Sequence, residues 1–537
     1  MRIDVIDTDQ AFHDVRENWD RVFMSDPFAQ HFLSWVWLKR YLFRRKRWFI
    51  LALREKAEGS PYVAFFPLRI VTILNEKTGR FYDEMIMAGN FAADYTGFLT
   101  MAEYEQHAVE GFCSYIRQQN WTNLKIEYFY GPPGRREAMI RALQGPDVIF
   151  RDSTPKSLND IDNCVCPGVP LPDTFDAYLD SRMSSQSRQK LRRFLRKVES
   201  DADWQITFAT PQTIKRDITI LFDLWRIKWA PFKGKERTER LIAGSREMLM
   251  DCFVDGNLDV PVLWYQGKPL GALANIVDRQ KMAVLFYVTG RDENWKTPSP
   301  GFVLHGYCIR RAIDNGFRYY DFLRGNEPYK YMFGPDERQI SCTLFRSRTG
   351  ENLGGTLHPR SIRFVYEKAL QLYKEGKKGN AEVAFKQVVD AAPQHYGARF
   401  GLANLLFEKG KLPQAEVVFS TLARQVDSPV PVLMRLGETQ LALHHYEEAS
   451  VTFQKVTKLS PFNREALYKR GVALTASGKT VEALEIFSTL KGYYSDNPVH
   501  REYTEKAKLA FDRLMGSLGI GLSKLPPVPA TPKLLHS

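Results

Sequence analysis

The chain is 537 residues long, which is too long for one hydrophobic core and typical of two to four domains. With 44% hydrophobic, 13% aromatic and 26% charged residues, its composition excludes low-complexity disorder, and no apolar run approaches the roughly 18 residues that a bilayer-spanning helix needs. The net charge of +13 indicates an anionic partner: a nucleotide cofactor, a nucleic acid, or an acidic lipid or polysaccharide surface.

The N-terminus and the cysteines indicate the compartment. Residues 1–15 lack the basic-then-apolar order of an export signal, so we expect a cytoplasmic protein. Only Cys164 and Cys166 lie close together, and the six cysteines form neither a disulfide framework nor the paired CxxC spacing of a zinc site. We therefore expect reduced thiols and, because no HxH or HExxH spacing occurs, no catalytic metal.

Residues 1–345 combine helix and strand signals. Within 173–200 a strong amphipathic helix is predicted, because its apolar residues recur at the spacing of a buried stripe. These residues are Leu191, Phe194, Leu195 and Val198. Arg188, Arg192 and Arg196 line another face at four-residue intervals, where like charges repel. We expect a negative partner for them; a solvated basic face and a contact with phosphate or nucleic acid both stay open.

A second helix is predicted around 221–232, where Trp225 and Trp229 are four residues apart. The two indoles either line an acceptor pocket together with Arg226 and Lys228, or belong to the core.

Strands joined by turns follow. The strands are predicted at 260–265, 270–277 and 282–290, with turns at 266–268 and near Asp278. Ser299, Pro300 and Gly301 precede a helical pattern that Asn315 and Gly316 terminate, and a last strand is predicted at 317–323. His305, one turn into that helix, is expected to be a buried structural histidine.

This order of strands, glycine-headed helix and strand resembles the GNAT acyltransferase fold, in which the helix N-terminus binds the pyrophosphate of coenzyme A. The segments DFLRGNEPYKYMFG (321–334) and SSQSRQKLRRFLRKVE (184–199) resemble the GNAT-like domain of CelD-type proteins, which are often encoded with exopolysaccharide or cellulose genes. Residues 31–43, 62–70 and 94–100 extend the resemblance to about 10–345.

The two-part architecture is also similar to the Fem-type aminoacyl transferases. Lys330, Phe333 and Gly334 match the K-x-x-F-G ending of those enzymes, whose lysine lies at the acyl-donor site. The resemblance implies an α+β unit of two tandem GNAT-like halves, residues 1–165 and 166–345. It implies an N- or O-acyltransferase that uses acetyl-CoA or another acyl-CoA on a sugar or amino-containing precursor, in exopolysaccharide, cellulose or cell-envelope biosynthesis.

One departure from that family keeps two alternatives open. The usual pyrophosphate loop, R/Q-x-x-G-x-G/A, is replaced by KTPSPGFV (296–303), with one glycine and two prolines that lack amide donors. The alternatives are a catalytically inactive scaffold of a polysaccharide-synthesis assembly and a Fem-like transferase that uses aminoacyl-tRNA, which the arginine helix would suit.

The site predicted from these motifs has three parts. Acyl transfer needs a base, a donor for the developing oxyanion and a route for the leaving group's charge. Lys330 is assigned to the acyl carbonyl or donor phosphate, Asp321 or Glu327 to the base, and Tyr329 to substrate positioning or proton supply. Alternatively, Asp321 pairs with Arg324 or Lys330. The donor-binding residues are Ser299, Gly301, Phe302 and Arg324; the substrate-binding residues are Trp225, Trp229, Arg188 and Arg192.

The last third of the chain repeats itself every 34 residues. The repeating positions are Ala369, Ala403, Gly437 and Gly471; Ala381, Ala415, Ala449 and Ala483; and Phe385, Phe419, Phe453 and Phe487. This pattern resembles the tetratricopeptide repeat (TPR), whose small residues let two helices cross closely. We expect a linker at 346–361, four repeats over 362–497, a capping helix at 498–517 and a disordered tail at 518–537. A TPR array offers a concave surface for a protein partner; the alternative is that it only holds subunits together.

Overall fold

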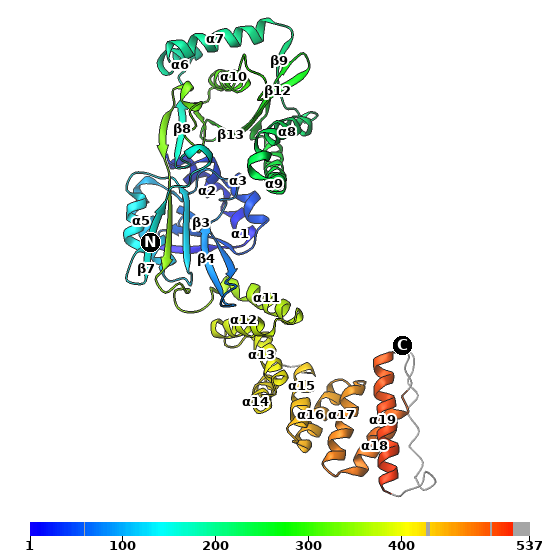
Figure 1. Cartoon of the computed structure of the whole chain (residues 1–537). Helices are drawn as coiled ribbons and strands as arrows, with labels where there is room; N and C mark the ends of the chain where they lie inside the picture. Colours follow the sequence, from blue (N-terminus) through cyan, green and yellow to red (C-terminus); the bar gives the residue numbers. More distant parts are fainter. Residues whose placement is uncertain (58, 426–429, 494–496, 519–537) are drawn as a thin grey trace. The chain divides into compact units, whose positions relative to one another are not determined.

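The computed structural model describes residues 1–57, 59–425, 430–493 and 497–518 (Figure 1). They divide into two compact units. The first unit comprises Met1–Ile73 and Tyr82–Ser361, and the second comprises Leu74–Phe81 and the chain from Ile362 onward. In these described ranges no helix has the length and apolarity needed to span a membrane. The expected disordered tail lies outside the described residues from residue 519 onward.

The first half of the first unit is built on a mixed sheet with strand order β1-β2-β3-β4-β6-β16-β7, and β5 pairs with β3. Its strands are β1 (Arg2–Ile6), β2 (Trp48–Arg54), β3 (Tyr62–Leu74), β4 (Phe81–Met87), β5 (Leu99–Thr100), β6 (Asn123–Phe129), β7 (Val148–Ser153) and β16 (Ser341–Ser347). Its helices are α1 (Asp9–Asp14), α2 (Arg16–Ser25), α3 (Trp35–Phe43), α4 (Glu105–Arg117) and α5 (Arg135–Leu143).

The second half has a sheet of order β15-β8-β14-β13-β12-β11-β9, and β10 pairs with β12. Its strands are β8 (Val165–Pro170), β9 (Trp204–Phe208), β10 (Leu258–Asp259), β11 (Pro261–Tyr265), β12 (Lys268–Asp278), β13 (Ala283–Arg291), β14 (Tyr319–Asp321) and β15 (Asp336–Gln339). Its helices are α6 (Phe175–Arg182), α7 (Ser185–Ser200), α8 (Ile214–Lys233), α9 (Lys235–Val254) and α10 (Pro300–Asp314).

The strands of the second sheet bury both faces, as their alternating side chains require. Leu263, Leu273 and Phe286 face a core shared with α7 and α10. Ala272 and Leu285 face the opposite core, which contains residues of α8, α9 and the first three helices of the chain, α1, α2 and α3. Helix α10 therefore lies on one side of β12 and β13, and α8 and α9 lie on the other side (Figure 1).

The two halves are not consecutive in sequence. Strand β16 leaves the second half and pairs between β6 and β7 of the first sheet. Residues 348–361, expected as a linker, also belong to the first unit. Asn352, His358 and Ser361 are buried there. The Asn352 side-chain amide, the His358 backbone N–H and the Ser361 hydroxyl donate hydrogen bonds to the carboxylate of Asp83.

The second unit is the predicted helical repeat. Its helices are α11 (Ile362–Lys374), α12 (Lys378–Ala391), α13 (Tyr396–Glu408), α14 (Leu412–Ala423), α15 (Val430–Ala442), α16 (Tyr446–Leu459), α17 (Arg464–Ala476), α18 (Thr480–Lys491) and α19 (Pro498–Ser517). A side chain at Gly437 or Gly471 would meet the ring of Phe453 or Phe487 at under 3 Å. The close helix crossing expected from the repeat is confirmed.

Candidate functional site

The central feature of the second half is a pair of parallel strands that separate. Strands β13 and β14 pair only over Ala283–Leu285 and Tyr319–Asp321, and beyond this point β13 continues to Arg291 paired only with β12. Helix α10 connects the two strands. Its first residue, Pro300, lies against Gly271, the partner of Arg291 on β12; a Cβ at Gly271 would be 2.9 Å from that of Pro300. The start of α10 therefore lies beside the end of β13.

The N-terminus of α10 is open. Ser299 is the N-cap residue, but its side chain makes no capping hydrogen bond, and the first turn contains no acidic residue. A Cβ at Gly301 would meet no atom within 4 Å. Pro300 has no N–H, so the amides of Gly301 and Phe302 carry the positive end of the helix dipole toward this space.

Asp321 is buried at the end of β14, where it joins the two halves. Its side chain is 1% exposed, and its oxygens accept hydrogen bonds from the Tyr95 hydroxyl at 3.0 and 2.9 Å and from the Leu323 amide at 2.7 Å. The guanidinium of Arg338 lies 3.4 Å away. Burial raises the pKa of Asp321, and Arg338 opposes that shift.

Lys330 holds the loop that follows β14. Its side chain is 2% exposed, and its ammonium donates hydrogen bonds to the carbonyls of Leu323, Arg324 and Gly325 at 3.4, 2.9 and 2.8 Å. It also lies 2.9 Å from Oε2 of Glu327, whose side chain is 37% exposed. Of the two carboxylates predicted as the base, Glu327 is the one that reaches solvent.

Tyr329 links this loop to α10. Its ring stacks on buried His305 with centroids 6.0 Å apart. Burial raises the pKa of Tyr329, Glu327 raises it further, and Arg291 opposes the shift. Phe333, just beyond, packs against Phe302 with centroids 5.3 Å apart. The loop, the start of α10 and the end of β13 therefore form one region.

Three residues that the sequence did not single out connect this region to the first half. Asp94 accepts hydrogen bonds from Arg324, whose guanidinium also lies 3.7 Å from the Tyr128 ring centroid. Tyr287 is passed over in the register of β12 and β13, which marks a β-bulge, and its pKa is raised by burial and by Asp94. A bulge and a contact across the halves leave no periodic signal in a single sequence.

A cavity of about 290 Å³ lies between α3 and α9. It is lined by Trp37, Tyr41, Phe91, Arg40, Arg44 and Arg45 from the first half and by Gly244, Glu247, Met248 and Asp251 from the second. Beside the cavity, Arg40 donates a hydrogen bond to Cys252 of α9 at 2.9 Å.

Comparison with known proteins identifies both units. Residues 185–331 match the family model described as "Acetyltransferase (GNAT) domain", and residues 372–431 and 432–498 match two tetratricopeptide-repeat models. The chain carries a GNAT-like acetyltransferase domain followed by TPR repeats.

Several relatives are similar to one unit or the other. The CTR9 homolog of Arabidopsis thaliana is 33% identical over 166 residues, which are 30% of this chain but only 14% of that relative's length. FemX is similar in structure at 10% identity, covering 64% of this chain and 97% of FemX with a TM-score of 0.42. A Bacteroides thetaiotaomicron protein of unknown function covers 65% of this chain and all of its own, at 11% identity and a TM-score of 0.38.

The predicted substrate residues lie on two helices of the acetyltransferase domain, α7 and α8. Arg188 and Arg192 on α7 pair with Asp180 and Asp176 of α6 at 2.6 and 2.7 Å, so carboxylates of the chain offset the basic face. Trp225 and Trp229 are half-buried on α8 with ring centroids 6.3 Å apart.

Proposed function

We propose that the protein is an acyl-CoA-dependent N- or O-acyltransferase that acts on a sugar or amino-containing precursor, as in exopolysaccharide or cell-envelope biosynthesis. The observation that carries the proposal is the open N-terminus of α10 beside the end of β13, with the loop of Glu327 and Lys330 against it. A helix N-terminus of this kind suits the pyrophosphate of a thioester donor. Ser299, Gly301 and Phe302 are assigned to that contact.

The chemistry is assigned to the loop after β14. Glu327 takes the proton of the acceptor amine or hydroxyl as that group attacks the thioester carbonyl carbon. The C–S bond then breaks, and the leaving sulfur takes a proton from the hydroxyl of Tyr329, which is protonated at neutral pH. The backbone at the Tyr287 bulge is assigned to the acyl oxygen, because a bulged residue leaves the strand ladder.

Three residues are assigned positioning roles. The Lys330 ammonium donates hydrogen bonds to three carbonyls and lies beside Glu327. These contacts favour a role in holding the loop rather than in direct contact with the acyl group. Asp321 fixes the end of β14 to Tyr95 of the first half. Arg324 fixes the loop after β14 to the first half through its hydrogen bond to Asp94.

The acceptor is assigned to the cavity between α3 and α9. Aromatic faces suit the apolar face of a sugar ring. Arg40 and Arg44 already pair with carboxylates of α9 and the residue after it. Arg45, which lies over the Tyr41 and Phe91 rings, is therefore assigned to the phosphate of an activated sugar. Its volume of about 290 Å³ is close to the lower end of small-molecule sites. Trp225, Trp229, Arg188 and Arg192 remain predicted substrate contacts, and the TPR unit is assigned to recruiting a protein partner.

The test begins with the donor. Acetyl-CoA, longer acyl-CoAs and free coenzyme A should bind the full chain in calorimetric titrations and raise its unfolding temperature in thermal-shift measurements. A panel of amino sugars and sugar nucleotides, assayed by release of free thiol, then identifies the acceptor. Glu327→Gln should lower kcat by roughly a hundredfold or more while leaving acetyl-CoA affinity unchanged.

Two outcomes would favour the alternatives. Stabilisation by aminoacyl-tRNA and by no thioester would indicate a Fem-like donor. Binding of neither a thioester nor aminoacyl-tRNA would indicate a catalytically inactive scaffold. Full turnover by Glu327→Gln would contradict the assignment of the base.

A further inference from the structure

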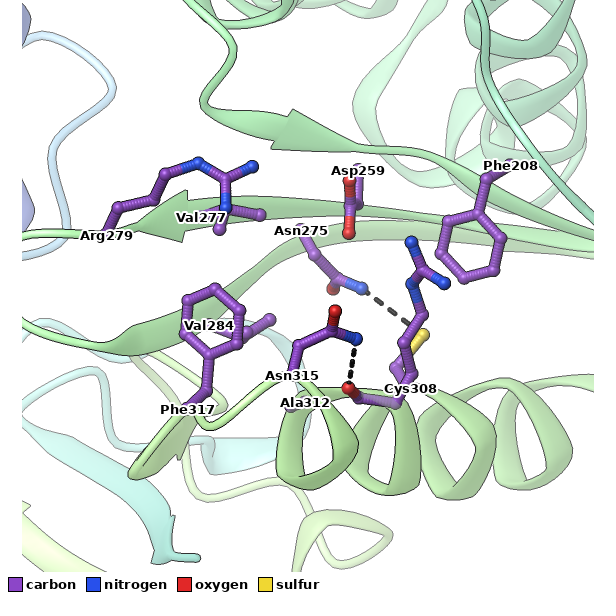
Figure 2. Close-up of a pocket in the computed structure, with 11 residues that line it drawn as sticks. Phe208, Asp259, Asn275, Val277, Arg279, Val284, Cys308, Ala312, Asn315 and Phe317 are labelled. Carbon is purple, nitrogen blue, oxygen red and sulfur yellow. Dashed lines mark hydrogen bonds between the residues drawn. The ribbon is translucent and has the colours of Figure 1, made fainter.

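A second cavity lies in the acetyltransferase domain, at the other end of α10. It has a volume of about 90 Å³ and is lined by the last turns of α10, the start of β13 and residues of β10 and β12 (Figure 2). Arg311 on its wall lies ten residues after Gly301, roughly 15 Å along the helix from the donor region. The proposed acyltransferase site therefore leaves this cavity unexplained.

Asn275 supplies the most informative group in the cavity. It is 1% exposed, and its Nδ2 donates a hydrogen bond to the Cys308 sulfur at 3.4 Å. Its Oδ1 is buried and has no hydrogen-bond partner among the described residues. Figure 2 shows the amide at the centre of the lining residues. Buried side-chain oxygens in native proteins are nearly always paired, so this acceptor indicates a missing donor.

Charged groups of both signs surround Asn275. Asp259 of β10 is its cross-strand neighbour, and burial raises the pKa of that carboxyl while Arg311 and Arg279 lower it. The Arg311 guanidinium is fixed over the Phe208 ring at 4.3 Å from the centroid. The cavity therefore offers two kinds of acceptor oxygen and two guanidinium groups.

We propose that this cavity binds a small zwitterionic amino acid, with its ammonium on Asp259 and Asn275 Oδ1 and its carboxylate on Arg311 and Arg279. A simple anion would leave the Asn275 oxygen unpaired and face the Asp259 carboxylate. A simple cation would face two guanidinium groups. A zwitterion satisfies both sets at once.

The size of the cavity limits the side chain. At roughly 10–15 Å³ for each water-sized position, about 90 Å³ holds on the order of six to nine such positions. Glycine, alanine and serine fit this range, whereas aromatic amino acids do not. The ligand is therefore an amino acid with a small side chain.

The test is calorimetric or ligand-observed NMR titration of the full chain with glycine, L-alanine and L-serine, beside acetate and methylammonium. The three amino acids should bind, and each singly charged compound should bind roughly tenfold more weakly or worse. Asp259→Asn and Arg311→Gln should each weaken amino-acid binding by roughly tenfold. Arg310→Gln is the matched control, because Arg310 is adjacent on α10 but pairs with Glu199 outside the cavity; it should bind as the unmodified chain does.

Asn275→Leu tests the unpaired oxygen separately, since leucine has a similar shape and no acceptor. Binding should be lost in this variant; if it does not fold, the exposed Arg311 supplies the decisive variant. Three results would overturn the proposal: no binding of any of the amino acids at millimolar concentration, acetate binding as tightly as glycine, or unchanged binding in Asp259→Asn and Arg311→Gln.

Discussion

The two halves of the first unit share a strand–helix–strand motif but differ at the N-terminus of its helix. In the first half, β4 and β6 run parallel over Glu84–Ile86 and Asn123–Lys125, and α4 connects them. In the second half, β13, α10 and β14 form the same arrangement. Helix α4 begins with Glu105, whose carboxylate accepts hydrogen bonds from Arg135 at 2.7 and 2.6 Å.

The comparison supports our proposal that the donor binds to the second half. The N-terminus of α4 already has a carboxylate of the chain, whereas that of α10 has no acid and open space at Gly301. An anion at a helix N-terminus is stabilising whether the chain or a ligand provides it. The first turn of α4 therefore carries an acidic side chain of the chain itself, whereas that of α10 carries none, which is consistent with a phosphate of the proposed donor there.

One carboxylate of each half shows the same difference. Asp83 at the start of the first motif is fully buried and accepts hydrogen bonds from Thr72, Ser361, Asn352 and the His358 amide. Glu327, in the loop after the second motif, is 37% exposed. The first arrangement suits stability, and the second fits our proposal that Glu327 is the base.

The largest effect is expected at Asp83. Asp83→Ala should lower the free energy of unfolding of the first unit by about 3 kcal/mol, because four donors lose their acceptor in a buried site. Chemical denaturation followed by tryptophan fluorescence measures this. Asp152→Ala, which removes an exposed partner of Arg136, is the control and should cost less than about 1 kcal/mol. Equal losses in the two variants would contradict the contrast between the halves.

The next largest effect is expected from a substitution that gives the N-terminus of α10 an acidic residue, as α4 has at Glu105. Gly301→Asp should weaken acetyl-CoA binding about tenfold to a hundredfold, or about 1.4–2.7 kcal/mol, because a carboxylate then repels the donor phosphates. Thermal stability should stay the same or rise slightly. Gly301→Ala adds a Cβ without charge and serves as the control in the same titration. Unchanged affinity in Gly301→Asp would place the donor elsewhere.

Each half also contains a buried neutral histidine that should make its stability fall in acid. Burial lowers the pKa of His305 to about 3 and that of His358 to about 4. As pH falls below about 6.5, the unfolded chain binds a proton that the folded chain does not, so each histidine costs about 1.4 kcal/mol per pH unit until its folded pKa is reached.

Unfolding of His305→Gln and His358→Gln should therefore depend less steeply on pH between about 6.5 and 4. Denaturation midpoints measured across that range give the slope. A slope identical to that of the unmodified chain would mean that these rings titrate normally.

The smallest effect is expected on α7. Arg188→Gln and Arg192→Gln should each change stability by less than about 1 kcal/mol, because their partners Asp180 and Asp176 are exposed. A raised KM for the acceptor with unchanged kcat would support their predicted role in substrate binding. An unchanged KM in both variants would mean that Arg188 and Arg192 form surface ion pairs and do not bind the substrate.

Local patterns were sufficient for many elements. The stripe of Leu191, Phe194, Leu195 and Val198 is buried on α7, and α10 runs from Pro300 to Asp314, as its start and stop signals predicted. The final strand is shorter than the predicted 317–323, because Leu323 adopts a left-handed conformation with φ of 56°. The predicted turn at Gln266 and Gly267 has positive φ at both residues.

The sequence by itself determined the repeats, the bounds of α10 and the likeness of residues 185–331 to a GNAT-like acetyltransferase domain, since each depends on residues close together along the chain. Only the tertiary structure decided the partners of the charged groups. Tyr95 and Asp321 are 226 residues apart, and β16 crosses back to the first sheet. Such contacts depend on how separate elements pack in three dimensions, which no local periodicity encodes.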